Sequence, residues 1–147
     1  MRNLIPLALL GITTVLGAGS ALAGTTDIEM LNKRGPNAFV YSSDIVRIEP
    51  GDSIAFVATT KGHNAQSIKG MLPDGADEIR LGFNETKTIT FTTPGVYGIR
   101  CTPHTGAGMV TAVVVGEPVN LAAAKAAAVN LPPKARQRLV AALSTLD

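Results

Sequence analysis

An all-β domain followed by two helices is the fold that this 147-residue sequence predicts. Between residues 24 and 116, short stretches of alternating apolar and polar residues are separated by turns rich in proline and glycine. This pattern is typical of a β-sandwich or a β-barrel. After Gly116 the composition changes to alanine-rich segments with helical periodicity. Before residue 24 the chain has the features of a targeting segment, which does not belong to the fold.

Residues 1–23 are predicted to be a signal peptide. Arg2 precedes an apolar run at 4–16, and Ala21-Leu22-Ala23 supplies the small-x-small pattern that a signal peptidase recognises. The run is shorter than the roughly 20 residues of a spanning helix, so no membrane insertion is expected after cleavage. Cleavage after Ala23 would leave a single domain, 24–147, of 124 residues.

Seven segments of the domain are expected to be strands because their apolar residues alternate or run continuously. In chain order they are 27–32, 39–41, 44–48, 53–59, 86–92, 95–101 and 109–115. Successive side chains of a strand point to opposite faces. If Tyr97 and Ile99 face the core, Cys101 therefore faces it too, at the end of its strand.

The last part of the chain, about 118–146, is expected to form two helices. Residues 120–129 are rich in alanine, the best helix former, and two prolines at 132 and 133 separate them from a second segment, 134–146. The second segment has leucine and valine at helical spacing. We expect both helices to pack on the sandwich, which covers about 24–116, and to take no part in the chemistry.

The composition argues against nucleic-acid binding and limits the roles open to the single cysteine. Without its first 23 residues the chain has 12 basic and 11 acidic side chains, and no basic tract suggests a nucleic-acid partner. Cys101 is the single cysteine and cannot form an internal disulfide. An unprotected thiol is a liability in an oxidising compartment, so a bound metal is one explanation of its presence.

The spacing Cys101-x2-His104-x4-Met109 carries the chemical signal. A compact loop of this length can direct all three side chains to one point, and His63 lies at the end of another predicted strand. Two imidazoles, a thiolate and a thioether are the ligands of a blue-copper electron-transfer site. Zinc could occupy the same ligands, although structural zinc sites rarely use a thioether.

A Cys101–His104 nucleophile is the competing chemical interpretation. It would leave Met109 and His63 without a role, and no third group that orients the base is evident. The metal site is the interpretation that uses all four residues.

Several motifs resemble the pseudoazurins, a family of periplasmic cupredoxins. They are Gly62-His63-Asn64, Gly70-Met71-Leu72-Pro73-Asp74-Gly75-Ala76, Pro94-Gly95-Val96-Tyr97-Gly98 and Cys101-Thr102-Pro103-His104. Plastocyanin shares the spacing of the ligand loop but lacks the helical tail. The resemblance implies an eight-stranded Greek-key cupredoxin β-sandwich that holds one type 1 copper ion, Cu(I) or Cu(II), on His63, Cys101, His104 and Met109. Four ligands would leave no open position for a substrate, so we expect an electron carrier and not an enzyme.

The resemblance also implies roles around the copper. His104 would be the exposed ligand in an apolar patch, and His63 the buried one. Asn64 would brace the cysteine loop by hydrogen bonds, beside Thr102. Pro103 would remove a backbone donor near the metal.

Electron-transfer partners are implied as well: copper nitrite reductase or other periplasmic reductases, and cytochrome c-type donors, met by a monomer or weak dimer. A ring of basic residues would steer these encounters. The candidates are Lys33, Lys61, Lys69 and Lys87, with Arg34 and Arg100 as further possibilities. The alternative function is a periplasmic copper chaperone or storage protein.

The chain departs from the pseudoazurin pattern at three positions near His104. Thr105 and Ala107 stand where an aromatic residue and a methionine are usual, and Phe39 stands where a methionine is common. We hypothesise that Phe39 stacks on His104 and makes it rigid, and we count Phe39 with the docking surface.

Overall fold

The computed structural model describes residues 22–147. The predicted signal peptide lies almost entirely outside these residues. Within the described part of the chain, no helix is long and apolar enough to cross a membrane.

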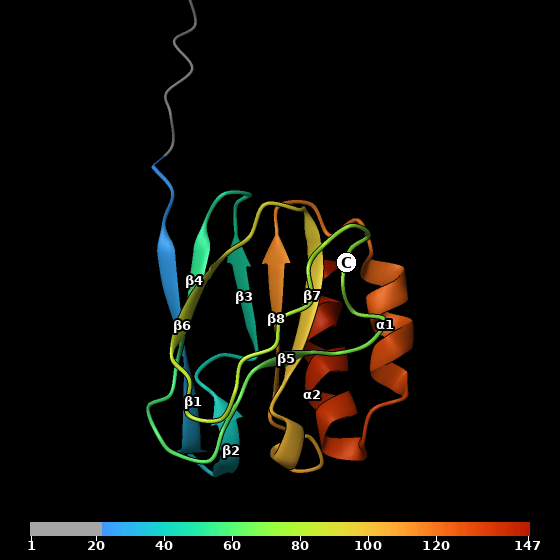
Figure 1. The fold of residues 1–147 in the computed structure, drawn as a ribbon. Helices are drawn as coiled ribbons and strands as arrows, with labels where there is room; N and C mark the ends of the chain where they lie inside the picture. The colour runs from blue at the N-terminus through green and yellow to red at the C-terminus, as the bar shows by residue number, and fades with distance from the viewer. Residues whose placement is uncertain (1–21) are drawn as a thin grey trace, which may run out of the picture.

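Two four-stranded sheets face each other in the described residues (Figure 1). The first has the order β2-β1-β4-β6 and the second the order β3-β8-β7-β5. The strands are β1 (Thr25–Arg34), β2 (Asn37–Tyr41), β3 (Ile45–Ile48), β4 (Ser53–Val57), β5 (Gln66–Ser67), β6 (Lys87–Thr90), β7 (Gly95–Arg100) and β8 (Val110–Val115). The predicted sandwich is confirmed, and eight strands are found in the described residues, as expected.

The main core fills the space between the two sheets. Tyr97, Ile99 and Cys101 all contribute to it, which confirms the parity expected from their spacing. Met109 is also fully buried in this core, just before β8 begins. The side chains of Cys101 and Met109 are therefore both buried at the end of the sandwich where β7 ends.

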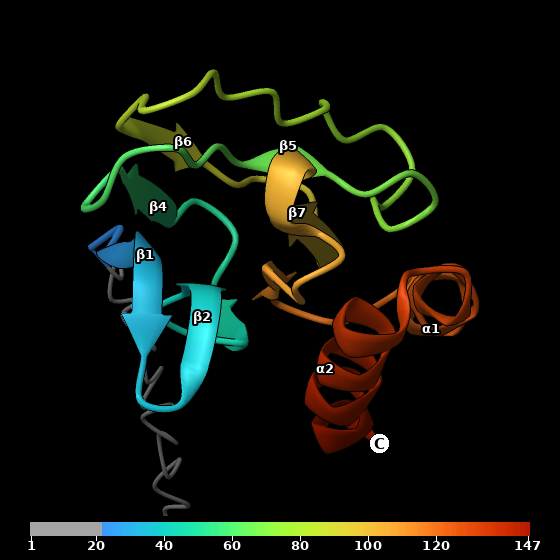
Figure 2. The same cartoon turned by 90° about the horizontal axis from the view of Figure 1, so that it is seen from below.

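Two helices cover the outer face of the second sheet. They are α1 (Leu121–Val129) and α2 (Pro133–Leu143), followed by a 3₁₀ turn, Ser144–Leu146. Seen from below, they lie on one side of the sandwich beside β7 (Figure 2). Their buried leucines and alanines form a second core with the outward residues of β7 and β8. Every residue of β8 is buried because the strand is covered on both faces.

The predicted strands differ from the observed ones in one element and several boundaries. β5 was not predicted, because Gln66 and Ser67 carry no apolar alternation. It forms only because this segment lies along β7, where Gln66 pairs with Arg100 and Ser67 with Ile99. β1 is longer than the predicted 27–32 because it pairs with β4 from Thr25 onward and with β2 as far as Arg34.

Asp52 fastens the turn between β3 and β4 to the start of β1. Its carboxylate accepts hydrogen bonds from the backbone N–H of Gly24, at 2.7 Å, and of Glu49, at 2.9 Å. These bonds lower the pKa of Asp52 from its ordinary value of 3.8. A carboxylate with a lowered pKa adds stability that is present above the unfolded pKa and is lost as the pH falls through the folded pKa.

We predict that Asp52→Asn lowers the urea midpoint of unfolding near neutral pH, because asparagine has one acceptor oxygen where aspartate has two. The difference from wild type should shrink as the pH is lowered toward about 2. Asp74→Asn is the control, since Asp74 is an exposed turn residue whose carboxylate accepts no hydrogen bond from residues 22–147. A difference that does not change with pH would contradict the assignment.

Candidate metal centre

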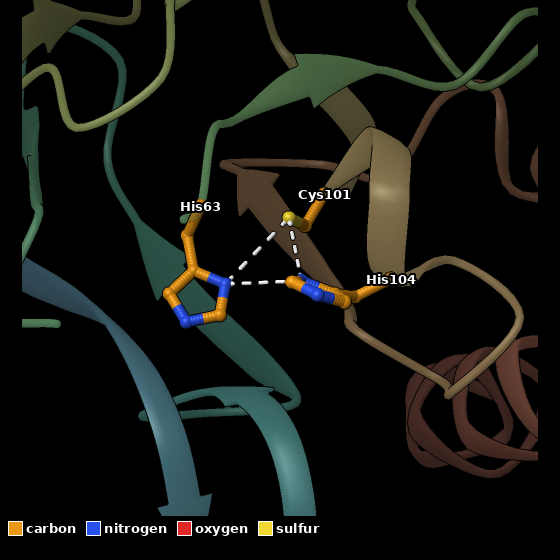
Figure 3. Close-up of side chains that lie close together, drawn as sticks. All are labelled: His63, Cys101 and His104. Atoms are coloured by element: carbon orange, nitrogen blue, oxygen red, sulfur yellow. Dashed lines mark hydrogen bonds between the residues drawn. The ribbon is translucent and has the colours of Figure 1, made fainter. Parts of the chain in front are cut away.

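Three potential metal ligands meet at one end of the sandwich. Cys101 follows β7, His104 closes the 3₁₀ turn Thr102–His104, and His63 precedes β5. The Nδ1 atoms of the two histidines are 3.2 Å apart. The Sγ atom of Cys101 lies 3.8 Å from Nδ1 of His63 and 3.5 Å from Nδ1 of His104. Figure 3 shows both rings turning these nitrogens toward the sulfur.

The triangle has the size that a metal ion needs. A point equidistant from the three atoms lies about 2.0 Å from each of them, close to the length of a metal–imidazole bond and slightly below that of a metal–thiolate bond. A set of two imidazoles and one thiolate suits copper or zinc. The residues present therefore fit the metal that the sequence predicts.

Asn32 sets the orientation of His63, a role that no sequence pattern predicted. Its Oδ1 atom accepts a hydrogen bond from Nε2 of His63 at 2.9 Å. The proton of the ring is thus held on Nε2, and the lone pair of Nδ1 is left facing Cys101. Asn32 is far from His63 in the chain and belongs to β1, so only the pairing of the sheet brings the two together.

Asn64 ties the segment that carries His63 to the loop that carries Cys101. Its side chain donates to Oγ1 of Thr102 at 2.8 Å and accepts from the backbone N–H of Thr102 at 2.9 Å. The carbonyl of Asn64 in turn accepts a hydrogen bond from the hydroxyl of Tyr41 at 2.7 Å. Hydrogen bonds therefore hold both the side chain and the backbone carbonyl of Asn64.

The ligand loop is held closed by its own backbone. The N–H of Met109 donates to the carbonyl of His104 at 3.1 Å, and the N–H of Cys101 donates to the carbonyl of Met109 at 3.0 Å. Met109 is fully buried beside these residues. The hydroxyl of Thr105 donates to the carbonyl of Cys101 at 2.8 Å and so secures the turn from inside.

The hairpin of β1 and β2 contacts both histidines. The ring of Phe39 stacks on the ring of His104 with centroids 4.1 Å apart and planes 3° from parallel, which confirms the stacking that we hypothesised. Phe39 has a φ of 51°, a left-handed conformation that is strained for a bulky residue. The ladder of the hairpin pairs the residues on either side of Asn32 and Phe39 but not these two with each other. The two residues that leave the ladder are those that contact His104 and His63.

Burial shapes the electrostatics of the centre. His63 and Cys101 are both fully buried. Burial raises the pKa of the Cys101 thiol. Burial, with the nearby His104, lowers the pKa of His63. A buried thiol with a raised pKa is a poor nucleophile and is out of reach of a substrate, which argues against a Cys101–His104 nucleophile.

The four predicted docking lysines are all exposed. Lys33 lies in the β1–β2 hairpin, and Lys61 lies two residues before His63; both are exposed. Lys87 is exposed at the start of β6, and Lys69 is exposed beside Gly70, where a Cβ would lie 3.3 Å from Cβ of Ala127 in α1.

The two arginines considered with them are partly buried. Arg34 pairs with Asp44 at 2.7 Å, and the Nε atom of Arg100 is buried without a hydrogen-bond partner among the described residues. Of the rim residues, Pro103 is exposed, whereas Phe39 and His104 are half-buried.

Comparisons with known proteins agree with this geometry. Residues 28–116 match the family model of copper-binding proteins of the plastocyanin/azurin family. The chain is 47% identical over 131 residues to a pseudoazurin of Paracoccus pantotrophus, covering 88% of this chain and 89% of that one. It is 35% identical over 114 residues to the plastocyanin of Prochlorothrix hollandica, covering 70% and 82%. The crystal structure of pseudoazurin from Methylobacterium extorquens AM1 superposes with a TM-score of 0.79 at 40% identity, covering 84% of this chain and 99% of that one. The fold is therefore the cupredoxin fold.

We predict that Phe39→Leu increases the motion of the His104 ring, because leucine removes the stacked face. The free energy of unfolding of the metal-free protein should fall by about 1 kcal/mol, the worth of an aromatic pair. Side-chain NMR relaxation and urea unfolding measure the two effects. Phe83→Leu is the control, since Phe83 is 60% exposed and has no ring contact within residues 22–147. Equal ring motion in the two variants would contradict the role of the stack.

Proposed function

Because this chain belongs to the plastocyanin/azurin family of copper-binding proteins, we propose that it carries single electrons on one type 1 copper ion. The copper ligands in this proposal are His63, Cys101, His104 and Met109. The observation that carries it is the triangle of Nδ1, Nδ1 and Sγ atoms that face one another at 3.2–3.8 Å. Copper bound there would supply the Cu(I)/Cu(II) couple, which takes up and releases one electron.

The residues of the chain keep the ligands in one arrangement for both oxidation states. Asn32 holds the His63 ring, and Asn64 holds the loop that follows Cys101. Phe39 covers one face of His104. Ligands that move little on a change of metal charge favour rapid electron exchange, and these contacts oppose such movement.

His104 is the proposed exit for the electron. It is half-buried, whereas His63 and Cys101 are fully buried. Pro103 beside it is exposed and has no N–H to bind water. The apolar rim of Phe39, Pro103 and Ala107 would let a partner approach the ring closely.

Periplasmic redox proteins are the proposed partners, with copper nitrite reductase or another reductase as acceptor and a c-type cytochrome as donor. Lys33 and Lys61 are the best-placed candidates for attracting an acidic partner, since their elements adjoin the metal centre. Lys69 and Lys87 would extend the proposed basic surface. A monomer or a weak dimer would leave this end accessible.

Export to the periplasm is proposed from the apolar segment and the Ala21-Leu22-Ala23 pattern. Cleavage after Ala23 would make Gly24 the first residue. Its nitrogen lies 2.7 Å from the carboxylate of Asp52, so the new positive charge would be favourably placed.

A copper chaperone or storage protein is the second candidate. Such a function requires ligands that are exchanged readily and are often exposed. Full burial of Cys101 and His63 favours the carrier.

We predict that the purified protein gains an intense visible thiolate-to-copper absorption when one equivalent of Cu(II) is added. Cys101→Ser should abolish the colour, because the thiolate is the source of the band. Visible spectroscopy and metal analysis check both statements. A colourless or weakly coloured copper complex of the wild type would favour the chaperone, and colour retained in Cys101→Ser would overturn the ligand assignment.

We predict that electron transfer to copper nitrite reductase slows as salt is added, because screening weakens long-range attraction. Lys61→Gln and Lys33→Gln should each lower the second-order rate constant by about two- to tenfold at low salt. Stopped-flow mixing across ionic strengths is the measurement. Lys125→Gln is the matched control, since Lys125 lies on α1 and pairs with Asp147. Equal rates for all three variants would argue against docking through this end.

A further inference from the structure

We propose that Arg138 of α2 is a positioning residue for Met109 and so tunes the metal centre from outside the ligand set. This rests on the proposed function. The Nη1 atom of Arg138 donates to the carbonyl of Gly108 at 2.5 Å, across 30 positions of the chain. The side chain is only 14% exposed. We expected the helices to take no part in the chemistry, and this contact leads to the opposite inference.

Gly108 is where the ligand loop meets the helix. Its φ of 90° is a conformation that favours glycine, and a Cβ there would lie 3.2 Å from Cβ and 3.5 Å from backbone atoms of Lys134. The loop and the first turn of α2 are therefore in direct contact. Arg138, one turn further along the helix, adds a directed hydrogen bond to this packing.

The carbonyl that Arg138 binds belongs to the peptide group that Gly108 shares with Met109. The N–H of that same group donates to the carbonyl of His104 at 3.1 Å. The peptide group between Gly108 and Met109 is thus held on one side by the carbonyl of His104 and on the other by Arg138 of α2. A planar peptide turns as a unit, so loss of the contact on the helix side would free the backbone from which the Met109 side chain projects.

Arg138 is itself anchored by a second arginine through a shared carboxylate. Its Nε atom lies 3.7 Å from Oδ1 of Asp44, and the same oxygen accepts from Nη2 of Arg34 at 2.7 Å. Arg34 also donates to the carbonyl of Ser42 at 2.7 Å. The planar guanidinium of arginine can contact the carboxylate of Asp44 and the carbonyl of Gly108 at the same time. The single ammonium group of lysine cannot do so in the same geometry.

Holding the helix to the sandwich does not by itself require this arginine. Ala135, Leu139 and Leu143 already bury the inner face of α2 against the second sheet. A partly desolvated ion pair adds little net stability. In blue-copper sites a weak thioether ligand tunes the redox potential, so a residue that positions Met109 would tune the proposed centre.

The test compares Arg138→Met, which keeps an apolar stem without donors, with Arg138→Lys and wild type. In the Cu(II) proteins, Arg138→Met should change the ratio of the two visible thiolate-to-copper bands and shift the reduction potential. Its Cu(I) affinity, measured by chelator competition, should fall by about tenfold, as is usual when a group that supports a ligand is removed. The band ratio, reduction potential and Cu(I) affinity of Arg138→Lys should lie between those of Arg138→Met and wild type. Arg136→Met is the matched control, because Arg136 is an exposed residue of α2 whose guanidinium, within residues 22–147, bonds only the carbonyl of Val129.

A second readout needs no metal. In the metal-free protein the amide of Met109 should exchange with solvent several-fold faster in Arg138→Met than in Arg136→Met. Asp44→Asn, which leaves Arg138 in place but weakens its anchor, should act in the same direction with a smaller effect. The Asp44→Asn variant also tests the positioning role of Arg138 if Arg138→Met fails to fold.

The outcomes separate the two proposals. A wild-type protein without an intense copper band would overturn the proposed function and this inference with it. A wild-type band whose ratio, potential and Cu(I) affinity are unchanged in the Arg138 variants would overturn this inference alone. Lower thermal stability with unchanged spectra would show that Arg138 only fastens the helix, and would also overturn it.

Discussion

The pair of hydrogen bonds between Asn64 and Thr102 is the constraint on which the rest of the centre depends. Asn64 follows His63 in the chain, and Thr102 follows Cys101, so these bonds fix two ligand-bearing segments that are 38 positions apart. Once they are aligned, the thiol faces one imidazole, and the turn Thr102–His104 delivers the second. The hydroxyl of Tyr41 secures Asn64 from the core side. A rigid centre follows from this small set of hydrogen bonds.

Burying ionisable side chains at this centre lowers the stability of the fold unless a metal ion is bound there. Burial raises the pKa of Cys101 and lowers that of His63, so the apolar surroundings favour the uncharged forms of both. It also holds the pKa of Tyr41 well above its ordinary range. A cation bound between the ring nitrogens and the sulfur would replace the missing solvation and favour the thiolate. The polar atoms are arranged in advance for this charge, which is the usual property of a metal centre that must change little on redox.

Two parts of the chain that supply no proposed ligand support the centre from opposite sides. The β1–β2 hairpin contributes Asn32 to one histidine and Phe39 to the other. The helix α2 contributes Arg138 to the arm of the loop that ends in Met109. The strain of Phe39, with its positive φ, fits this division, since local backbone strain is found where surrounding structure holds a side chain in a functional position.

Much of the fold could be predicted because its signals are local. Alternation located seven of the eight strands in the described residues, and alanine-rich composition located the helices. β5 escaped because its two residues become a strand only through their partner β7. In the centre, the loop spacing and the strand parity identified Cys101, His104 and Met109 as candidates. Asn32 and Arg138 gave no local signal, since an asparagine in a strand and an arginine on a helix are ordinary surface residues.

The proposed donor set, the inward direction of Cys101 and the helical tail could all be predicted from the sequence. These depend on residue type and on the periods of strand and helix, which neighbouring residues specify. The packing of the folded chain sets which nitrogen of His63 faces the sulfur, which ring covers His104 and which helix residue bonds Gly108. Each of these is a contact between segments far apart in the chain, and its geometry exists only when the sheets are paired and the helices are packed against them.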